Sequence, residues 1–215
     1  CLLLLLPGCD TGESAQIAAT TLPVYQFTTR LCEGTGITVT RLVTENISCL
    51  HDYSLNVSQV KALEAAELTI ISGAGLEESM EDILCKSSCL IDSSATIPPL
   101  ECHGHGHEHE HSHEQDPHIW LAPQNAMVMA TNICRGLCDY APEYKDIFER
   151  NLSALVQELE ALDSYGKEQL QELSCRELIT FHDGFGYFAA AFDLEIVRAI
   201  EEESGSEASA QELKD

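Results

Sequence analysis

The first part of the chain alternates between short apolar, β-branched runs and segments with helical spacing. The apolar runs cover residues 17–21, 37–43, 68–72 and 90–91. The segments between them repeat apolar side chains every three or four residues, as on one face of a helix, over 22–31, 58–66 and 76–84. Strands that alternate with helices in this way build a parallel sheet covered by helices. The pattern therefore predicts an α/β fold.

Two long helical patterns follow. The first runs from Pro123 to about Tyr140, and the second covers residues 142–174, much longer than an average helix of about 11 residues. A strand, a helix and a strand are then predicted over 178–181, 184–192 and 194–200. The alternation of strand and helix thus begins again after the long helix.

This order of elements predicts two lobes, each with a parallel β-sheet flanked by helices. We expect an N-terminal lobe over 17–141, a connecting long helix over 142–174, and the start of an incomplete C-terminal lobe over 175–215. Residues 102–115 form a His-rich loop within the N-terminal lobe.

The chain opens with a leucine run between two cysteines, Cys1 and Cys9. Five leucines are too few to span a bilayer, which needs about 20 apolar residues, so we interpret residues 1–9 as a signal-peptide remnant. The sequence Leu-Pro-Gly-Cys that ends at Cys9 resembles a bacterial lipobox, although Pro7 is unusual there. We therefore expect Cys9 to be lipidated and the polar residues 10–16 to act as a tether.

The charge balance narrows the class of partner. A formal net charge of −25, from 11 basic and 36 acidic residues, disfavours nucleic acid, whose phosphates need clustered Lys and Arg. The ten cysteines contain no pair of CxxC motifs, so a structural zinc knuckle is not indicated and free, buried thiols are predicted.

Six of the nine histidines occupy every second position of one short tract. They are His103, His105, His107, His109, His111 and His113. Histidine-rich tracts bind metal, and neutral imidazole is the commonest metal ligand. Gly, Glu and Ser spacers offer no apolar face, so we expect no fixed conformation and a secondary, weak metal site.

A more specific hypothesis is that the three isolated histidines bind one metal ion together. They are His51, His118 and His182. Each lies where a strand or extended segment gives way to a loop or helix, and open parallel sheets bind ligands at the carboxyl ends of their strands. Taken singly, each is more often a structural histidine than a ligand. An acid stands beside every one of them, as a metal-bound imidazole often requires: Asp52, Asp116 and Asp183.

Three motifs strengthen that hypothesis by resemblance. The segments DPHIWL at 116–121, FHDGFGYF at 181–188 and HDYS at 51–54 are similar to those of zinc-binding receptors of ABC-type metal importers, which are periplasmic or lipid-anchored. The match extends over residues 17–212, and an acidic, His-rich insert before the DPHIW motif is typical of the zinc branch.

The resemblance implies two α/β lobes tied by one long helix, with Zn²⁺ held in the cleft between them. It places the metal ligands on His51, His118 and His182. It further implies a monomer outside the cytoplasmic membrane that delivers its metal to an ABC-type permease and its ATPase subunit. A receptor of this kind is not an enzyme.

The fourth ligand and the metal stay open at this point. Manganese receptors of the family place a carboxylate at the third position, where this chain has His182, and nitrogen donors favour zinc. Leu50 stands where some zinc receptors have Glu. Water, a carboxylate from further along the family's second lobe, or Cys49 could complete the site.

Three alternative functions remain. One is a receptor of the same type for manganese or another divalent metal. The second is a zinc buffer or chaperone that acts through the His tract. The third is a zinc hydrolase or hydratase, since three histidines with an open position also form a catalytic arrangement, but the sequence has no HExxH helix.

Overall fold

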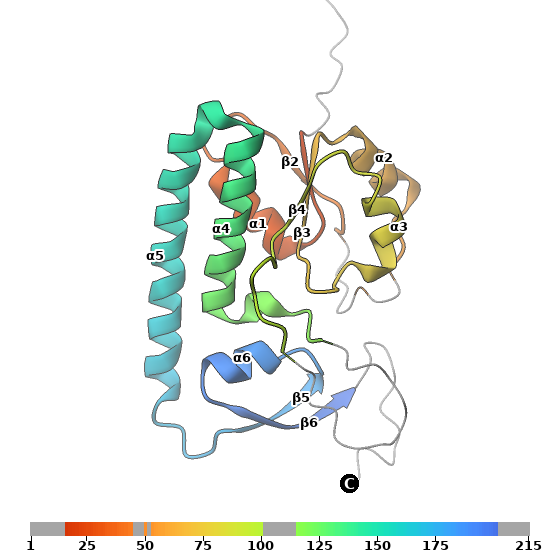
Figure 1. Ribbon diagram of the computed structural model, residues 1–215. Coiled ribbons are helices and arrows are strands. Elements are labelled where there is room, and N and C mark those ends of the chain that lie inside the picture. The colour runs from red at the N-terminus through yellow and green to blue at the C-terminus, as the bar shows by residue number, and fades with distance from the viewer. Residues whose placement is uncertain (1–15, 45–49, 51–52, 101–114, 202–215) are drawn as a thin grey trace, which may run out of the picture.

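The computed structural model describes residues 16–44, 50, 53–100 and 115–201 (Figure 1). The lipidation site proposed at Cys9, the signal-peptide remnant, His51 and the six tract histidines lie outside the described residues. The predictions for those positions therefore stay predictions.

Four parallel strands form the first sheet, in the order β2-β1-β3-β4. Their bounds are β1 (Ile17–Ala19), β2 (Val39–Arg41), β3 (Leu68–Ile71) and β4 (Leu90–Asp92). The strands are shorter than the apolar runs that predicted them. Residues just beyond β2, such as Leu42 and Val43, still donate backbone hydrogen bonds toward the chain around β1.

Helices cover both faces of this sheet, which we call with its helices the first lobe. Ile17 and Ala19 of β1 face one core, and Ala18 faces the other, as the alternation of side chains along a strand requires. The first core contains α1 (Leu22–Leu31) and α4 (Pro123–Tyr140), and the second contains α2 (Val57–Ala65) and α3 (Glu81–Leu84).

The long helix α5 (Lys145–Leu170) stands beside α4 and extends past the start of α4 to the level of the chain's last described helix, at residues 186–191 (Figure 1). Phe148 and Leu155 are its buried residues. A 3₁₀ turn, η3 (Pro142–Tyr144), precedes it, so the α-helix is shorter than the predicted 142–174. The end has a physical cause: Arg176 Nη1 donates to the carbonyl of Leu170 at 3.1 Å and caps the last turn.

The second lobe, as far as the structure describes it, is a parallel pair of strands with one helix. These elements are β5 (Glu177–His182), α6 (Gly186–Ala191) and β6 (Glu195–Glu201). His182 is the last residue of β5, not the residue after the strand as predicted. Two parallel sheets connected by one long helix confirm the predicted α/β fold class.

The helix predicted over 76–84 is wrong in its first half. A 3₁₀ turn, η1 (Glu78–Met80), and the short α3 replace it. Within the predicted span the backbone leaves α-helical geometry twice, at Glu77 with φ of −98° and ψ of 19° and at Met80 with φ of −109° and ψ of 1°.

Glu77 holds the loop that precedes η1 from inside. Its carboxylate is buried and accepts from Thr20 Oγ1 at 2.5 Å, from Ser72 N at 2.8 Å and from Gly73 N at 3.0 Å. Burial raises the pKa of Glu77, and these hydrogen bonds oppose the rise while the nearby Asp92 adds to it. The loop therefore depends on one buried acid.

The described cysteines are all free thiols. Cys32 and Cys134 are buried as predicted, and burial raises the pKa of both to about 12. The prediction is wrong for three others, which are exposed: Cys85, Cys89 and Cys175. No helix in the described segments has the length and apolar character needed to cross a membrane.

Candidate metal centre

The site begins in the segment that enters α4. Asp116 and His118 are buried here, and η2 (Ile119–Leu121) follows directly and leads into α4. The backbone N–H of His118 donates to Asp116 Oδ1 at 2.9 Å, which makes a tight local turn. Ile119 and Ala122 are anchored in the first core, so this turn is fixed to the first lobe.

The same carboxylate oxygen orients the imidazole of His118. Its Nδ1 lies 2.8 Å from Asp116 Oδ1. An ionised carboxylate only accepts hydrogen bonds, so we assign the ring proton to Nδ1. A neutral imidazole protonated there presents the lone pair of Nε2, which is the form that binds a metal.

The electrostatics of Asp116 agree with this assignment. Burial would raise the pKa of its carboxyl group. Hydrogen bonds from the His118 ring and backbone, the charge of His118 and the backbone N–H of Gly186 together lower the pKa below its ordinary value. Asp116 is therefore ionised at neutral pH.

His182 approaches the same point from the second lobe. Its Nε2 lies 3.3 Å from Nε2 of His118, although 64 positions separate the two residues. The ring centroids are 5.0 Å apart and the ring planes are nearly perpendicular, at 81°. The fold thus directs one nitrogen from each lobe toward a common point.

That separation suits two ligands of one tetrahedral metal ion. Two nitrogens bound to zinc at 2.0–2.1 Å with a tetrahedral angle between them would be about 3.3–3.4 Å apart. Without metal, the same distance suits a hydrogen bond in which His182 donates to the free Nε2 of His118. Metal binding would replace that proton with the ion.

Gly184 allows the two rings to meet. A Cβ on this residue would lie 2.7 Å from Cε1 and 2.8 Å from Nδ1 of His118, and 2.9 Å from Cδ2 of His182. Any side chain at position 184 would therefore displace at least one imidazole. Gly184 contributes by having no side chain. Its residue type therefore offered no functional group by which the sequence could have identified it as part of the site.

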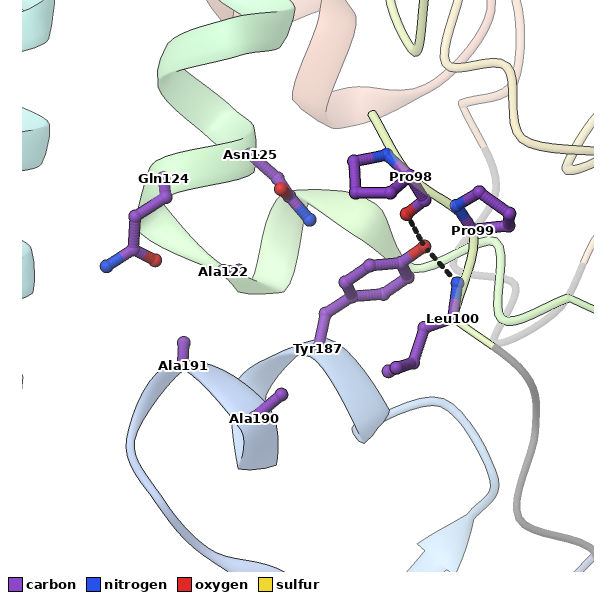
Figure 2. A pocket seen from close by; sticks show the side chains of 9 residues that line it. All are labelled: Pro98, Pro99, Leu100, Ala122, Gln124, Asn125, Tyr187, Ala190 and Ala191. Carbon is purple, nitrogen blue, oxygen red and sulfur yellow. Dashed lines mark hydrogen bonds between the residues drawn. The ribbon is translucent and has the colours of Figure 1, made fainter. Parts of the chain in front are cut away.

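Tyr187 ties the second lobe to the segment that leads into the His tract. Its hydroxyl accepts from Leu100 N at 2.9 Å and donates to Pro98 O at 3.1 Å. Tyr187 lines a pocket of about 430 Å³. Figure 2 shows that this pocket lies between the first turn of α4 and α6. Gln124 and Asn125 line the α4 side of the pocket.

The structure thus brings together two of the three predicted ligands. His118 and His182 meet, while His51 lies outside the described residues. The flanking chain is held, since Leu50 is buried and its carbonyl accepts from Ser79 Oγ at 2.8 Å. Within the described ranges, no group of three His, Cys, Asp or Glu side chains could hold a metal ion.

Of the three acids beside the histidines, Asp116 orients the ring of His118, and Asp52 lies outside the described residues. Sequence reasoning missed Gly184 and Gly186, although both belong to the FHDGFGYF motif. Their positions, two and four residues after the proposed ligand His182, were the available signal, because glycine lets the backbone approach a site closely.

Comparison with known proteins gives a consistent result. Residues 17–215 match the family described as ZnuA: Zinc-uptake complex component A periplasmic. The high-affinity zinc uptake system protein ZnuA of Haemophilus ducreyi is 30% identical over 216 residues, covering 90% of this chain and 69% of that protein. The manganese-binding lipoprotein MntA of Bacillus subtilis is 25% identical and covers 89% of this chain and 64% of that protein.

A solved structure agrees with these relatives. A crystal structure of ZnuA superimposes with a TM-score of 0.80 at 34% identity, over 93% of this chain and 75% of that one. The chain spans 72% of one curated relative, from Chlamydia trachomatis, and 54% of another, from Treponema pallidum. The chain belongs to the ZnuA family of periplasmic zinc-uptake components.

Proposed function

We propose that this protein is an extracytoplasmic receptor that binds Zn²⁺ between its two lobes and delivers it to an ABC-type permease with its ATPase subunit. The observation that carries the proposal is the 3.3 Å separation of the Nε2 atoms of His118 and His182. Membership of a family of periplasmic zinc-uptake components supports it. The lobes are those predicted at 17–141 and 175–215, on either side of the helix predicted at 142–174.

The proposed ligands differ in how far they are oriented before the metal binds. Asp116 already holds the His118 ring with Nε2 free, so this nitrogen is ready to bind. His182 arrives on β5 of the second lobe, and His51 is the proposed third ligand. A metal held by residues from both lobes stabilises their approach. Release to the permease would then require the lobes to separate.

Zinc is the proposed cargo because the site offers imidazole nitrogens, which suit zinc better than manganese. The manganese-binding name of one relative makes manganese the alternative cargo, and competition titrations of the parent with each metal would distinguish the two. The six tract histidines would hold additional zinc more weakly. A lipid anchor on Cys9 would keep the receptor, as a monomer, at the membrane surface.

We further propose that the protein performs no chemical step. Metal binding by a component of an uptake complex is enough to explain why two imidazoles converge, and no catalysed reaction is needed. Hydrolysis or hydration by the zinc-loaded protein is the alternative outcome. Two assays on the zinc-loaded protein would reveal such activity: one for hydrolysis of a carboxylic ester and one for hydration of CO₂.

A competition titration tests the proposal. Zinc would be partitioned between the protein and a chromophoric chelator for the parent, His118→Ala, His182→Ala and the tract control His109→Ala. We expect His118→Ala and His182→Ala to lower zinc affinity by more than about 100-fold. Loss of a metal ligand should cost more than the 10–100-fold that follows loss of a residue hydrogen-bonded to a ligand. Parent-like affinity in His182→Ala would contradict the proposal.

A further inference from the structure

One carboxylate connects the two lobes at the metal centre. Asp116 Oδ1 accepts from the backbone N–H and the Nδ1 of His118, which belong to the first lobe. Asp116 Oδ2 accepts at 3.1 Å from the backbone N–H of Gly186, which begins α6 in the second lobe. The side chain is almost completely buried, with 4% exposure, so water does not replace these donors.

The contact is close from both sides. A Cβ on Gly186 would lie 2.8 Å from Asp116 Oδ2 and 3.0 Å from Leu100 Cδ2. The backbone of the second lobe therefore touches the carboxylate with no intervening side chain. Four positions before Gly186 is His182, whose ring meets His118.

The chemistry of this position requires a carboxylate. Both oxygens of an ionised Asp accept hydrogen bonds, and both sides of the group face donors. Asparagine has the same shape but turns one oxygen into an NH₂ donor. Whichever way that amide is oriented, a donor would face either the His118 N–H groups or the Gly186 N–H, so only one lobe could be satisfied.

We propose that Asp116 is a positioning residue that sets the separation of the two imidazoles by binding both lobes at once. It fixes the ring orientation of His118 through one oxygen and the start of α6, near His182, through the other. This inference rests on the proposed metal site, and it adds that the approach of the lobes is encoded in a group that does not contact the metal.

The test uses the full chain with Asp116→Asn, Gly186→Ala and a matched control, Asp163→Asn. Asp163 also accepts hydrogen bonds through both carboxylate oxygens, from Gln124 Nε2 and from Lys167 Nζ, but it belongs to α5 and contacts neither histidine. Gly186→Ala leaves the Asp116 carboxylate in place but presses a Cβ against its Oδ2 from the second lobe, and it keeps the test available if Asp116→Asn does not fold.

Two measurements are made on the metal-free protein and one with zinc alone. Imidazole ¹⁵N spectra report the His118 tautomer, and amide hydrogen exchange reports the Gly186 N–H. We expect Asp116→Asn to change at least one of these and to lower zinc affinity by 10–100-fold, about the cost of losing an outer partner of a ligand. Gly186→Ala should keep the His118 tautomer and also lose affinity, and Asp163→Asn should change nothing.

Parent-like tautomer and exchange in Asp116→Asn, or an affinity loss no larger than that of Asp163→Asn, would overturn the inference. Failure of the proposed function would look different. In that case His182→Ala would keep the parent's zinc affinity, while the metal-free spectra would still show whether Asp116 holds both lobes.

Discussion

Gly184 packs so closely on His118 that a Cβ on the glycine would stand 2.7 Å from Cε1 of that ring. Real Cβ atoms essentially never approach a heavy atom this closely, so Gly184→Ala must move a ring or the loop. We expect this variant to lose 10–100-fold in zinc affinity, comparable to loss of an outer partner. Calorimetric or competition titration would measure the loss.

Gly36→Ala is the matched control for that substitution. A Cβ at this position meets no atom within 4 Å, but the residue has φ of +82°, which strains any side chain. It should therefore lower the midpoint of thermal unfolding and leave zinc affinity unchanged. Equal zinc affinity in Gly184→Ala and the parent would show that the loop after β5 does not determine the site.

Metal preference should follow the chemistry of position 182. Replacing His182 by Glu exchanges a nitrogen donor for oxygen, which manganese prefers. We expect the ratio of zinc to manganese affinity to fall in His182→Glu, with most of the change coming from weaker zinc binding. Competition titrations with each metal would measure it. An unchanged ratio would place the metal away from β5.

The His tract should be dispensable for the tightest zinc-binding event. The described residues on either side of the tract are held without it, since Asp116 N donates to Leu100 O at 3.0 Å and Leu100 N donates to the Tyr187 hydroxyl. Replacing all six tract histidines with asparagine should remove weak zinc equivalents from a calorimetric titration and leave the strongest event intact. Loss of the strongest event would reverse the two roles.

Glu77 should give the stability a distinct pH dependence. Because its pKa in the folded state is raised above the ordinary value of 4.5, the folded state binds more protons than the unfolded state in that range. The free energy of unfolding therefore falls as pH rises from about this value through the folded pKa.

Glu77→Gln removes that titration, so the variant should gain stability relative to the parent as pH rises. Urea unfolding of both proteins from pH 4 to 8 would show it. Glu64→Gln, an exposed acid on α2, serves as the control. Parallel stability curves for Glu77→Gln and the parent would contradict the raised pKa.

The hydrophobic pattern predicted most of the fold because buried strands and amphipathic helices repeat with fixed periods. It failed where a local contact overrides the period. Arg176 ends α5 at Leu170 through a hydrogen bond from outside the helix. Glu77, whose carboxylate accepts from Ser72 N and Gly73 N, leaves α-helical backbone geometry inside the span where apolar spacing indicated a helix.

The sequence singled out the histidines of the candidate site but not the residues that position them. His118 and His182 stood out because isolated histidines near strand ends are few. Asp116 could be suspected from its place beside His118, but its second contact, with Gly186, depends on how the lobes meet. No period or composition in the sequence reports a contact between 116 and 186.

Anomalous X-ray scattering from crystals of the zinc-loaded protein, recorded on both sides of the zinc absorption edge, tests the central claim most directly. The account predicts one strong peak about 2.0–2.1 Å from Nε2 of His118 and from Nε2 of His182. Asp116 should still accept a hydrogen bond from Nδ1 of His118. A zinc peak elsewhere, with no density between these two nitrogens, would contradict it.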